Sequence, residues 1–132
     1  MIVVDSSAII AILLREADRD TYARAIVAAD RNVMSTFTYF EATVALCARK
    51  GDPVAAIAID RFLTSQAFEL APYDRDQAEL SRTAYQRFGK GFHPAALNLG
   101  DCVSYALAKS LDAPLLFKGD DFAKTDVRRA VD

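Results

Sequence analysis

The feature that most constrains the fold is a regular alternation of short apolar runs with longer segments of helical periodicity. Four runs rich in β-branched and aliphatic side chains are predicted to be strands: residues 2–4, 32–36, 68–71 and 115–118. The segments between them place apolar side chains three and four residues apart, as in amphipathic helices. Strands that alternate with helices predict an α/β fold with a largely parallel sheet.

Capping and stop signals place the helices. We expect them at residues 6–14, 17–30, 38–50, 53–66, 74–88 and 100–111, with Ser6 or Ser7, Thr38 and Asn98 as candidate first-turn caps and Gly51 as a stop. Residues 89–100 are predicted to form a loop, and residues 126–131 are a candidate fifth strand. In the helix 38–50, Phe40, Val44 and Cys47 form the apolar stripe, and Glu41 beside it is expected to be half-buried.

Length and composition predict one soluble domain that spans residues 1–132. The hydrophobic fraction of 52% and the charged fraction of 26% suit a chain that buries its core without disulfides. Cys47 and Cys102 have no metal-binding spacing and are expected to be reduced core thiols, which favours a cytoplasmic location. Asp5 interrupts the apolar start and no basic residue precedes it, so we expect neither a signal peptide nor a membrane partner.

The net charge of −2 argues against a broad basic face for nucleic acid. A nucleic-acid partner would have to be held by a local patch or through a metal ion. The residues 54–59 are apolar on all sides, and a surface helix normally is not. We therefore expect a partner chain to cover the exposed half of that helix.

Acidic residues stand where α/β proteins place their ligands, beyond the carboxyl ends of the strands. Asp5 ends the first run, and Asp120 and Asp121 follow the fourth. Glu41 lies early in the helix after the second run, and Asp101 lies in the first turn of the helix before the fourth. In a parallel sheet these side chains can converge at one edge.

A converged acidic cluster needs a positive partner. Two carboxylates about 5 Å apart repel by roughly 3 kcal/mol at an effective dielectric near 20, so three mutually close acids cost on the order of 9 kcal/mol. A domain of this size has only about 5–15 kcal/mol of net stability. The cluster must therefore hold a proton or a cation such as Mg²⁺, which prefers carboxylate oxygens and can activate water beside a phosphodiester. Three structural roles stay open: Asp5 as a helix cap, Asp101 as a complement to the helix dipole, and Asp120 with Asp121 as turn residues.

Several motifs resemble one family over most of the chain. Ile2-Val-Val-Asp5-Ser-Ser7-Ala8 resembles the opening of PIN domains, and Glu41 matches the second acid of that family. The block from His93 through Asn98-Leu-Gly-Asp101 to Ala108 is similar to the third-acid block of VapC toxins, and Leu115-Leu-Phe-Lys-Gly-Asp-Asp-Phe122 resembles their fourth. The chain is thus identified as a PIN-domain ribonuclease of the VapC type.

The resemblance implies a three-layer α/β/α sandwich with a central, largely parallel sheet of four or five strands. It also implies a Mg²⁺ site, with Mn²⁺ as an alternative, endonucleolytic cleavage of RNA, a cognate antitoxin and a homodimer. Asp5 and Asp101 carry over as metal ligands, Glu41 as a ligand or water-orienting acid, and Ser7 as a polar neighbour. The fourth block departs from the family pattern at Phe117 and Gly119, so the fourth acid is shifted to Asp120 or Asp121, with Asp120 preferred.

Two rival functions compete with this reading of the sequence. A phosphorylatable receiver domain needs an acceptor Asp at the end of its third strand, where this chain has Ala71-Pro72, and it gives Glu41 no role. A PIN-like protein that binds RNA or a partner without cutting is the alternative that stays open, and cleavage in Mg²⁺ against EDTA separates it from an enzyme. His93 is the only histidine, and the family mechanism requires none.

Overall fold

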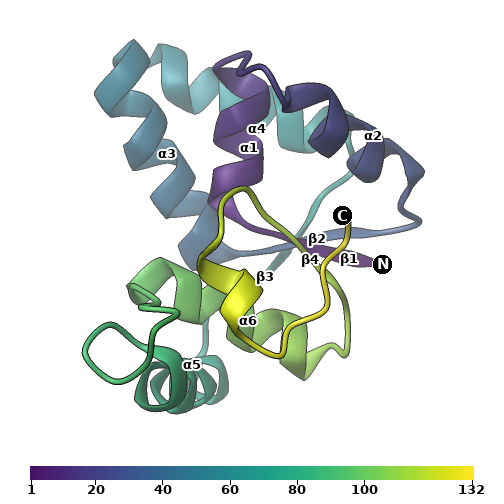
Figure 1. Cartoon of the computed structure of the whole chain (residues 1–132). Coiled ribbons are helices and arrows are strands. Elements are labelled where there is room, and N and C mark those ends of the chain that lie inside the picture. The colour runs from purple at the N-terminus through teal and green to yellow at the C-terminus, as the bar shows by residue number, and fades with distance from the viewer.

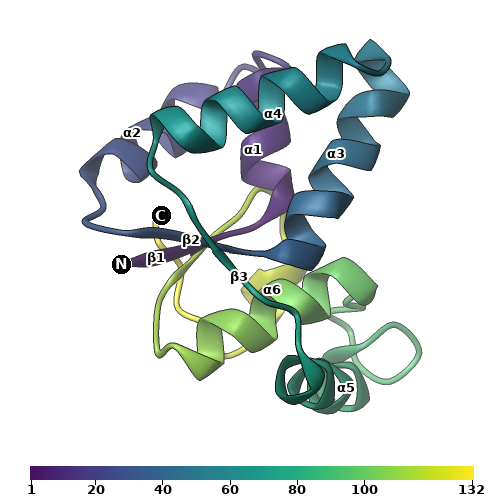
Figure 2. The same cartoon turned by 180° about the vertical axis from the view of Figure 1, so that it is seen from behind.

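The computed structural model describes all 132 residues and shows a four-stranded sheet between two layers of helices (Figures 1 and 2). The strands are β1 (Ile2–Val4), β2 (Asn32–Ser35), β3 (Glu69–Ala71) and β4 (Leu115–Leu116). Their order is β3-β2-β1-β4 and every pairing is parallel. The predicted parallel sheet and the three-layer sandwich are therefore confirmed.

Six α-helices surround this sheet: α1 (Ser6–Leu13), α2 (Arg19–Ala28), α3 (Thr36–Lys50), α4 (Val54–Ser65), α5 (Arg75–Phe88) and α6 (Leu99–Ser110). Figure 1 shows α1 to α4 on one side of the sheet and α5 with α6 on the other. None of these helices combines the length and the apolar character that a membrane crossing requires.

The layers follow from the alternation of side chains along the strands. Val3, Val33 and Leu115 point into a core shared with α5 and α6. Their neighbours Val4 and Leu116 point the other way, into a core shared with α1 and α2. A smaller apolar cluster joins α3 to α4. Strands β1, β2 and β4 are therefore covered on both faces, as their continuous apolar runs predict, whereas the edge strand β3 stays largely exposed.

The topology marks one edge of the sheet as the place for a site. The chain adds β2 and β3 on one side of β1 and then returns to place β4 on the other side. Ligands of open α/β sheets bind where the strand order reverses in this way, beyond the carboxyl ends. Asp5 follows β1 at this point, and its main-chain N–H donates to the carbonyl of Leu116 in β4 at 2.9 Å.

Some predicted element boundaries were wrong by a few residues. Residues 126–131 do not form a fifth strand: only Arg129 makes an isolated parallel bridge, to Leu115. A short 3₁₀ helix, Asp121–Lys124, was not predicted. Helix α3 begins two residues early because the Ser35 hydroxyl accepts from the main-chain N–H of Phe37 at 3.1 Å.

The predicted packing face of α3 was also wrong. Phe40 is 64% exposed and Val44 is 53% exposed, whereas Thr38, Ala42 and Leu46 are buried. The small side chains on the buried face let α3 pack against its neighbours α1, α4 and α6. Cys47 is accordingly only partly buried, while Cys102 lies in the core as predicted.

Helix α4 has the unpartnered apolar side that its sequence predicts. Ala55, Ile59 and Leu63 are buried against α3 and the last turn of α1. Val54 and Ile57, in contrast, are 55% and 49% exposed. The molecule therefore presents two separate groups of exposed apolar side chains, one on α3 and one on α4.

Candidate active site

Asp5 lies at the junction between β1 and α1 and is buried. It caps α1, since Oδ2 accepts from the main-chain N–H of Ser7 at 3.0 Å and from the Ser7 hydroxyl at 2.6 Å. Its other oxygen, Oδ1, accepts from the hydroxyl of Ser104 in α6 at 2.6 Å. The capping role left open by the sequence is therefore real, and the same contacts hold the carboxylate in one orientation.

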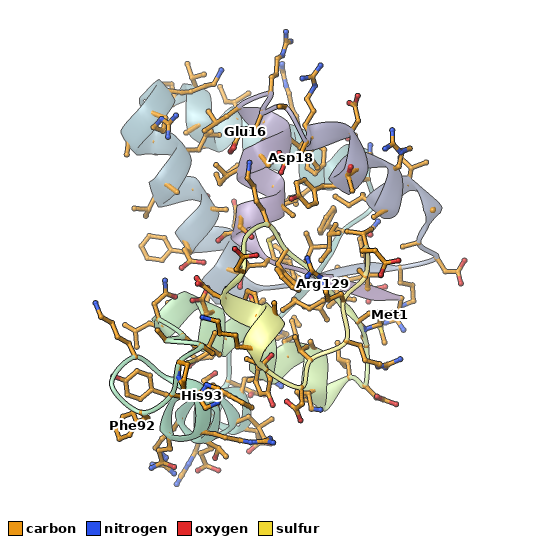
Figure 3. All side chains as sticks on the ribbon, viewed as in Figure 1. Met1, Glu16, Asp18, Phe92, His93 and Arg129 are labelled. Atoms are coloured by element: carbon orange, nitrogen blue, oxygen red, sulfur yellow. The ribbon has the colours of Figure 1, made fainter.

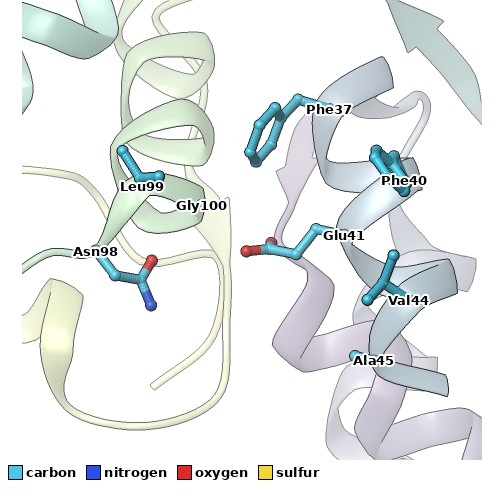
Figure 4. Close-up of a pocket in the computed structure, with 8 residues that line it drawn as sticks. All are labelled: Phe37, Phe40, Glu41, Val44, Ala45, Asn98, Leu99 and Gly100. Carbon is cyan, nitrogen blue, oxygen red and sulfur yellow. The ribbon is translucent and has the colours of Figure 1, made fainter. Parts of the chain in front are cut away.

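Glu41 reaches the same place from α3. The Ser6 hydroxyl donates to its Oε1 at 2.8 Å, so the predicted half-buried carboxylate has its polar partner. Burial and the nearby charge of Asp5 raise the pKa of Glu41, and the hydrogen bond from Ser6 opposes them. Gly100 faces this carboxylate so closely that a Cβ there would overlap Glu41. Figure 4 shows Glu41 extending from α3 toward the first turn of α6.

Asp101 completes the group from the first turn of α6. Its Oδ2 accepts from the main-chain N–H of Asn98 at 3.0 Å, while Asn98 Oδ1 accepts from the N–H of Asp101 at 2.9 Å, which is a capping box. Burial raises the pKa of Asp101 to about 7 against the hydrogen bond from Asn98, and the charges of Asp5, Asp121 and Glu41 raise it further. The three acids predicted to converge therefore act on one another.

The fourth acid stays a prediction. Asp120 is exposed, and its side chain caps nothing although it precedes the 3₁₀ helix. Asp121 is the residue of this pair whose charge raises the pKa of Asp101. The structure thus brings Asp121 into electrostatic contact with the cluster, and it shows no such link for the preferred candidate, Asp120.

The cluster has the chemistry of a site for a hard cation. None of the ion pairs in the structure involves Asp5, Glu41, Asp101, Asp120 or Asp121, so no protein cation offsets their charge. Carboxylate oxygens are the ligands that Mg²⁺ prefers. In the structure, however, no three His, Cys, Asp or Glu side chains lie close enough together to hold a metal ion. Hydrogen bonds from Ser7 and Ser104 hold the Asp5 carboxylate, and one from Asn98 holds that of Asp101. A carboxylate that accepts such bonds keeps further lone pairs for a cation.

A groove runs beside Glu41. Its volume is about 490 Å³, and its lining is apolar apart from Glu41 and Asn98 (Figure 4): Phe37, Phe40, Glu41, Val44, Ala45, Asn98, Leu99 and Gly100. Leu99, at the start of α6, is 74% exposed on one wall of this groove. A second cavity of about 320 Å³ shares Phe37 and Leu99 with it. The acidic cluster is thus bordered by an open apolar surface.

Sequence reasoning missed four residues that shape the site: Ser6, Gly100, Ser104 and Lys118. Ser104 had a signal, because it follows Asp101 by three residues and so shares its helix face. Lys118 had none, since its partners are about a hundred residues away in the sequence. His93 lies with Phe92 in the loop beside α5 (Figure 3). Its Nδ1 accepts from the N–H of Ala95 at 3.0 Å and its ring packs on Phe88, contacts that serve the loop.

Comparison with known proteins agrees with this geometry. The family model described as PIN domain matches residues 2–128. Ribonuclease VapC28 of Mycobacterium tuberculosis is 47% identical over 131 residues, which cover 98% of each chain. Ribonuclease VapC of Mycolicibacterium smegmatis is 44% identical over 125 residues, covering 95% of this chain and 96% of the relative.

Solved structures show the same fold. The toxin VapC20 of Mycobacterium tuberculosis, described as cleaving the sarcin-ricin loop, superposes with a TM-score of 0.80 at 18% identity over 96% of both chains. A toxin–antitoxin complex from Klebsiella pneumoniae gives a TM-score of 0.70 at 20% identity, covering 96% of this chain and 93% of that one. The chain therefore belongs to the PIN-domain family, in the group of the VapC ribonucleases.

Proposed function

We propose that this chain is an endoribonuclease of the VapC type, the toxin of a type II toxin–antitoxin pair. Close relatives named as VapC ribonucleases over nearly the whole chain support the assignment. The observation that carries it is the convergence of Asp5, Glu41 and Asp101 from three separate segments: Asp5 is bonded to Ser104 of α6, Glu41 is bonded to Ser6 beside Asp5, and Glu41 faces Gly100 beside Asp101. None of the three acids takes part in an ion pair.

PIN-domain nucleases of this group generally depend on a divalent metal. In this chain Asp5 and Asp101 would hold the ion, with Mg²⁺ as the expected metal and Mn²⁺ as an alternative. When bound, it would neutralise charge on the scissile phosphodiester and lower the pKa of a water. Glu41 has a raised pKa and one oxygen not bonded to Ser6, so it suits a group that orients that water or accepts its proton.

An antitoxin that blocks the site has to reach the acids, and the groove along Glu41 leads there. We therefore assign this groove, with Phe40, Val44 and Leu99, to an apolar segment of the cognate antitoxin. The exposed side of α4, with Val54 and Ile57, is assigned to a homodimer contact.

The test is cleavage of a labelled single-stranded RNA in Mg²⁺ and in EDTA, by the wild type and by Asp5→Asn. The variant keeps the volume and the capping oxygen but removes a charge, so we expect cleavage in Mg²⁺ only and a loss of several orders of magnitude in the variant. The control is Asp30→Asn, an exposed carboxylate outside the cluster, which should cleave as the wild type does. Cleavage that survives EDTA contradicts a metal-dependent nuclease, and RNA binding without cleavage supports the non-catalytic alternative.

A further inference from the structure

Lys118 lies two residues beyond the end of β4 and is fixed at two points. Its main-chain N–H donates to the hydroxyl oxygen of Ser7 at 3.0 Å. Its ammonium group donates to Glu16 at 2.7 Å and to Asp18 at 3.0 Å, both in the segment between α1 and α2. One residue thus ties the end of β4 to the start of α1 and to the turn that follows α1.

The Ser7 hydroxyl links the main chain of Lys118 to Asp5. A hydroxyl has one proton, and the Ser7 oxygen accepts from Lys118. The Ser7 proton therefore stays available for Asp5, whose Oδ2 accepts it at 2.6 Å. This bond orients the Asp5 carboxylate together with those from the Ser7 main-chain N–H and the Ser104 hydroxyl, and it is the one that the main chain of Lys118 supports.

The partners of the ammonium group form a firm anchor. Asp18 also accepts from the hydroxyl of Tyr22 at 2.9 Å, and Tyr22 is a buried core residue of α2. Figure 3 shows Glu16 and Asp18 close together at the α1–α2 turn. These two carboxylates raise the pKa of Lys118, so its charge persists at every physiological pH.

The chain turns at Gly119, directly after Lys118, so the main-chain and side-chain bonds of Lys118 hold the chain just before this turn. Gly119 has φ of +101°, a conformation that only glycine adopts readily, and the chain turns there into Asp120 and Asp121. Lys118 is therefore the last position before the turn that is bonded to another element through both its main chain and its side chain.

We propose that Lys118 is a positioning residue of the nuclease site: its ion pairs with Glu16 and Asp18 hold its main-chain N–H on Ser7, and Ser7 fixes the ligand orientation of Asp5. The proposal rests on the proposed function. It assigns a role to an ion-pair bridge that touches neither the RNA nor the metal.

The test compares Lys118→Met, which keeps an unbranched apolar stem but lacks the ammonium group, with Lys118→Arg, which restores the charge. Mn²⁺ affinity is measured without RNA by electron paramagnetic resonance, and kcat and KM are measured on a labelled RNA. Groups that orient metal ligands typically change metal affinity or activity by about 10- to 100-fold. We expect losses of that order in Mn²⁺ affinity and in kcat for Lys118→Met, little change in KM, and recovery in Lys118→Arg.

A matched control exists at the other edge of the sheet. Arg31→Met breaks a two-bond ion pair with Glu69 at the amino ends of β2 and β3, far along the strands from Asp5. It should change melting temperature as much as Lys118→Met does and leave Mn²⁺ affinity and kcat at wild-type values. Unchanged Mn²⁺ affinity and kcat in Lys118→Met would overturn the proposal.

Two further variants separate a bridge from a direct RNA contact. If the bridge matters, the Glu16→Gln and Asp18→Asn double variant behaves like Lys118→Met. If the Lys118 ammonium itself binds phosphate, that double variant frees it and lowers KM, which contradicts the proposal.

A double-variant cycle tests the link through Ser7. The losses of Mn²⁺ affinity and kcat in Ser7→Ala and in Lys118→Met should not multiply when the two are combined, because both act on Asp5 through one chain of bonds. Losses that do multiply would count against the proposal. If Asp5→Asn is inactive while Lys118→Met is normal, the inference fails and the proposed function stands. If Asp5→Asn cleaves normally, the proposed function itself fails.

Discussion

The Asp101 carboxylate both caps a helix and lies in the acidic cluster. It closes the capping box of α6 through Asn98, and it faces Asp5, Asp121 and Glu41, whose charges help to raise its pKa to about 7. Without a cation, folding therefore favours the protonated form of this side chain. A divalent ion held there, as proposed, would reverse that preference, because it would stabilise the carboxylate.

The first prediction uses this difference between folded and unfolded states. The unfolded pKa of Asp101 is near 3.8 and the folded pKa is about 7, so between these values the folded chain holds a proton that the unfolded chain has lost. The free energy of unfolding must then fall as the pH rises from about 4 to 7, and the penalty persists above pH 7. Asp101→Asn removes it while keeping a capping oxygen.

We therefore expect Asp101→Asn to be more stable than the wild type at pH 8 by about 2 kcal/mol, a value reduced for solvent screening at a partly exposed group. At pH 5 the gain should be much smaller. Urea unfolding in EDTA at both pH values measures it, with Asp30→Asn as the control for loss of an exposed charge. An equal gain at both pH values would contradict the raised pKa. Cleavage by Asp101→Asn should fall by several orders of magnitude.

The second prediction concerns Gly100, where the space for a side chain is taken by Glu41. Alanine is a better helix former than glycine by about 1 kcal/mol, so Gly100→Ala should keep a melting temperature close to the wild type. The new methyl group must displace the Glu41 carboxylate and break its bond with Ser6. We expect roughly a tenfold loss or more in cleavage. On a Glu41→Gln background the same substitution should cost little, and a full additional loss there would show that Gly100 acts by another route.

At the scale of elements, the sequence predicts the junctions between strands and helices well. It predicts less well which face of a helix is buried. The β1–Asp5–α1 junction was predictable because an apolar run, an acid and two serines are all local signals. The buried face of α3 was not, since Phe40 and Val44 are more hydrophobic than Thr38 and Ala42, yet they face outward. A hydrophobic side chain at an interface between chains has the same sequence signal as one in the core. Single-chain reasoning places both in the core.

The third prediction separates the structural role of Asp5 as the cap of α1 from its role in the site. Asparagine caps helices as well as aspartate does, whereas alanine loses about 0.5–2 kcal/mol. Asp5→Ala also leaves the hydroxyl of buried Ser104 without its acceptor. We expect Asp5→Ala to unfold at lower urea concentration than Asp5→Asn, and both to be equally inactive on RNA. Activity in Asp5→Asn that approaches the wild type would mean that Asp5 serves the fold alone.

At the scale of the whole molecule, the site exists only because four distant stretches meet. The general rule for parallel sheets predicts that Asp5 and the residues after β4 lie near each other. The same rule led to the expectation that Glu41 and Asp101 lie near them, and in the structure the charges of Asp5, Asp121 and Glu41 act on Asp101. The contact of Lys118 with Glu16 and Asp18 follows no local pattern, because it depends on how the α1–α2 turn packs over β4. Side-chain links of this kind become visible only in the folded chain.

The last prediction concerns the two apolar surfaces, on α3 with α6 and on α4. Both are exposed in the free chain, so a charge placed on either should cost the isolated fold little. Buried in an interface, the same unpaired carboxylate costs several kcal/mol. If α4 forms the proposed homodimer contact, the wild type should sediment as a dimer and Ile57→Asp as a monomer at the same concentration, and the variant should still bind the antitoxin. Phe40→Asp should remain dimeric and lose antitoxin binding, because Phe40 lines the groove beside Glu41. Sedimentation velocity gives the first result and titration calorimetry with the antitoxin gives the second. Exchanged phenotypes would reverse the assignment of the two surfaces, and two variants that dimerise and bind as the wild type does would rule out both.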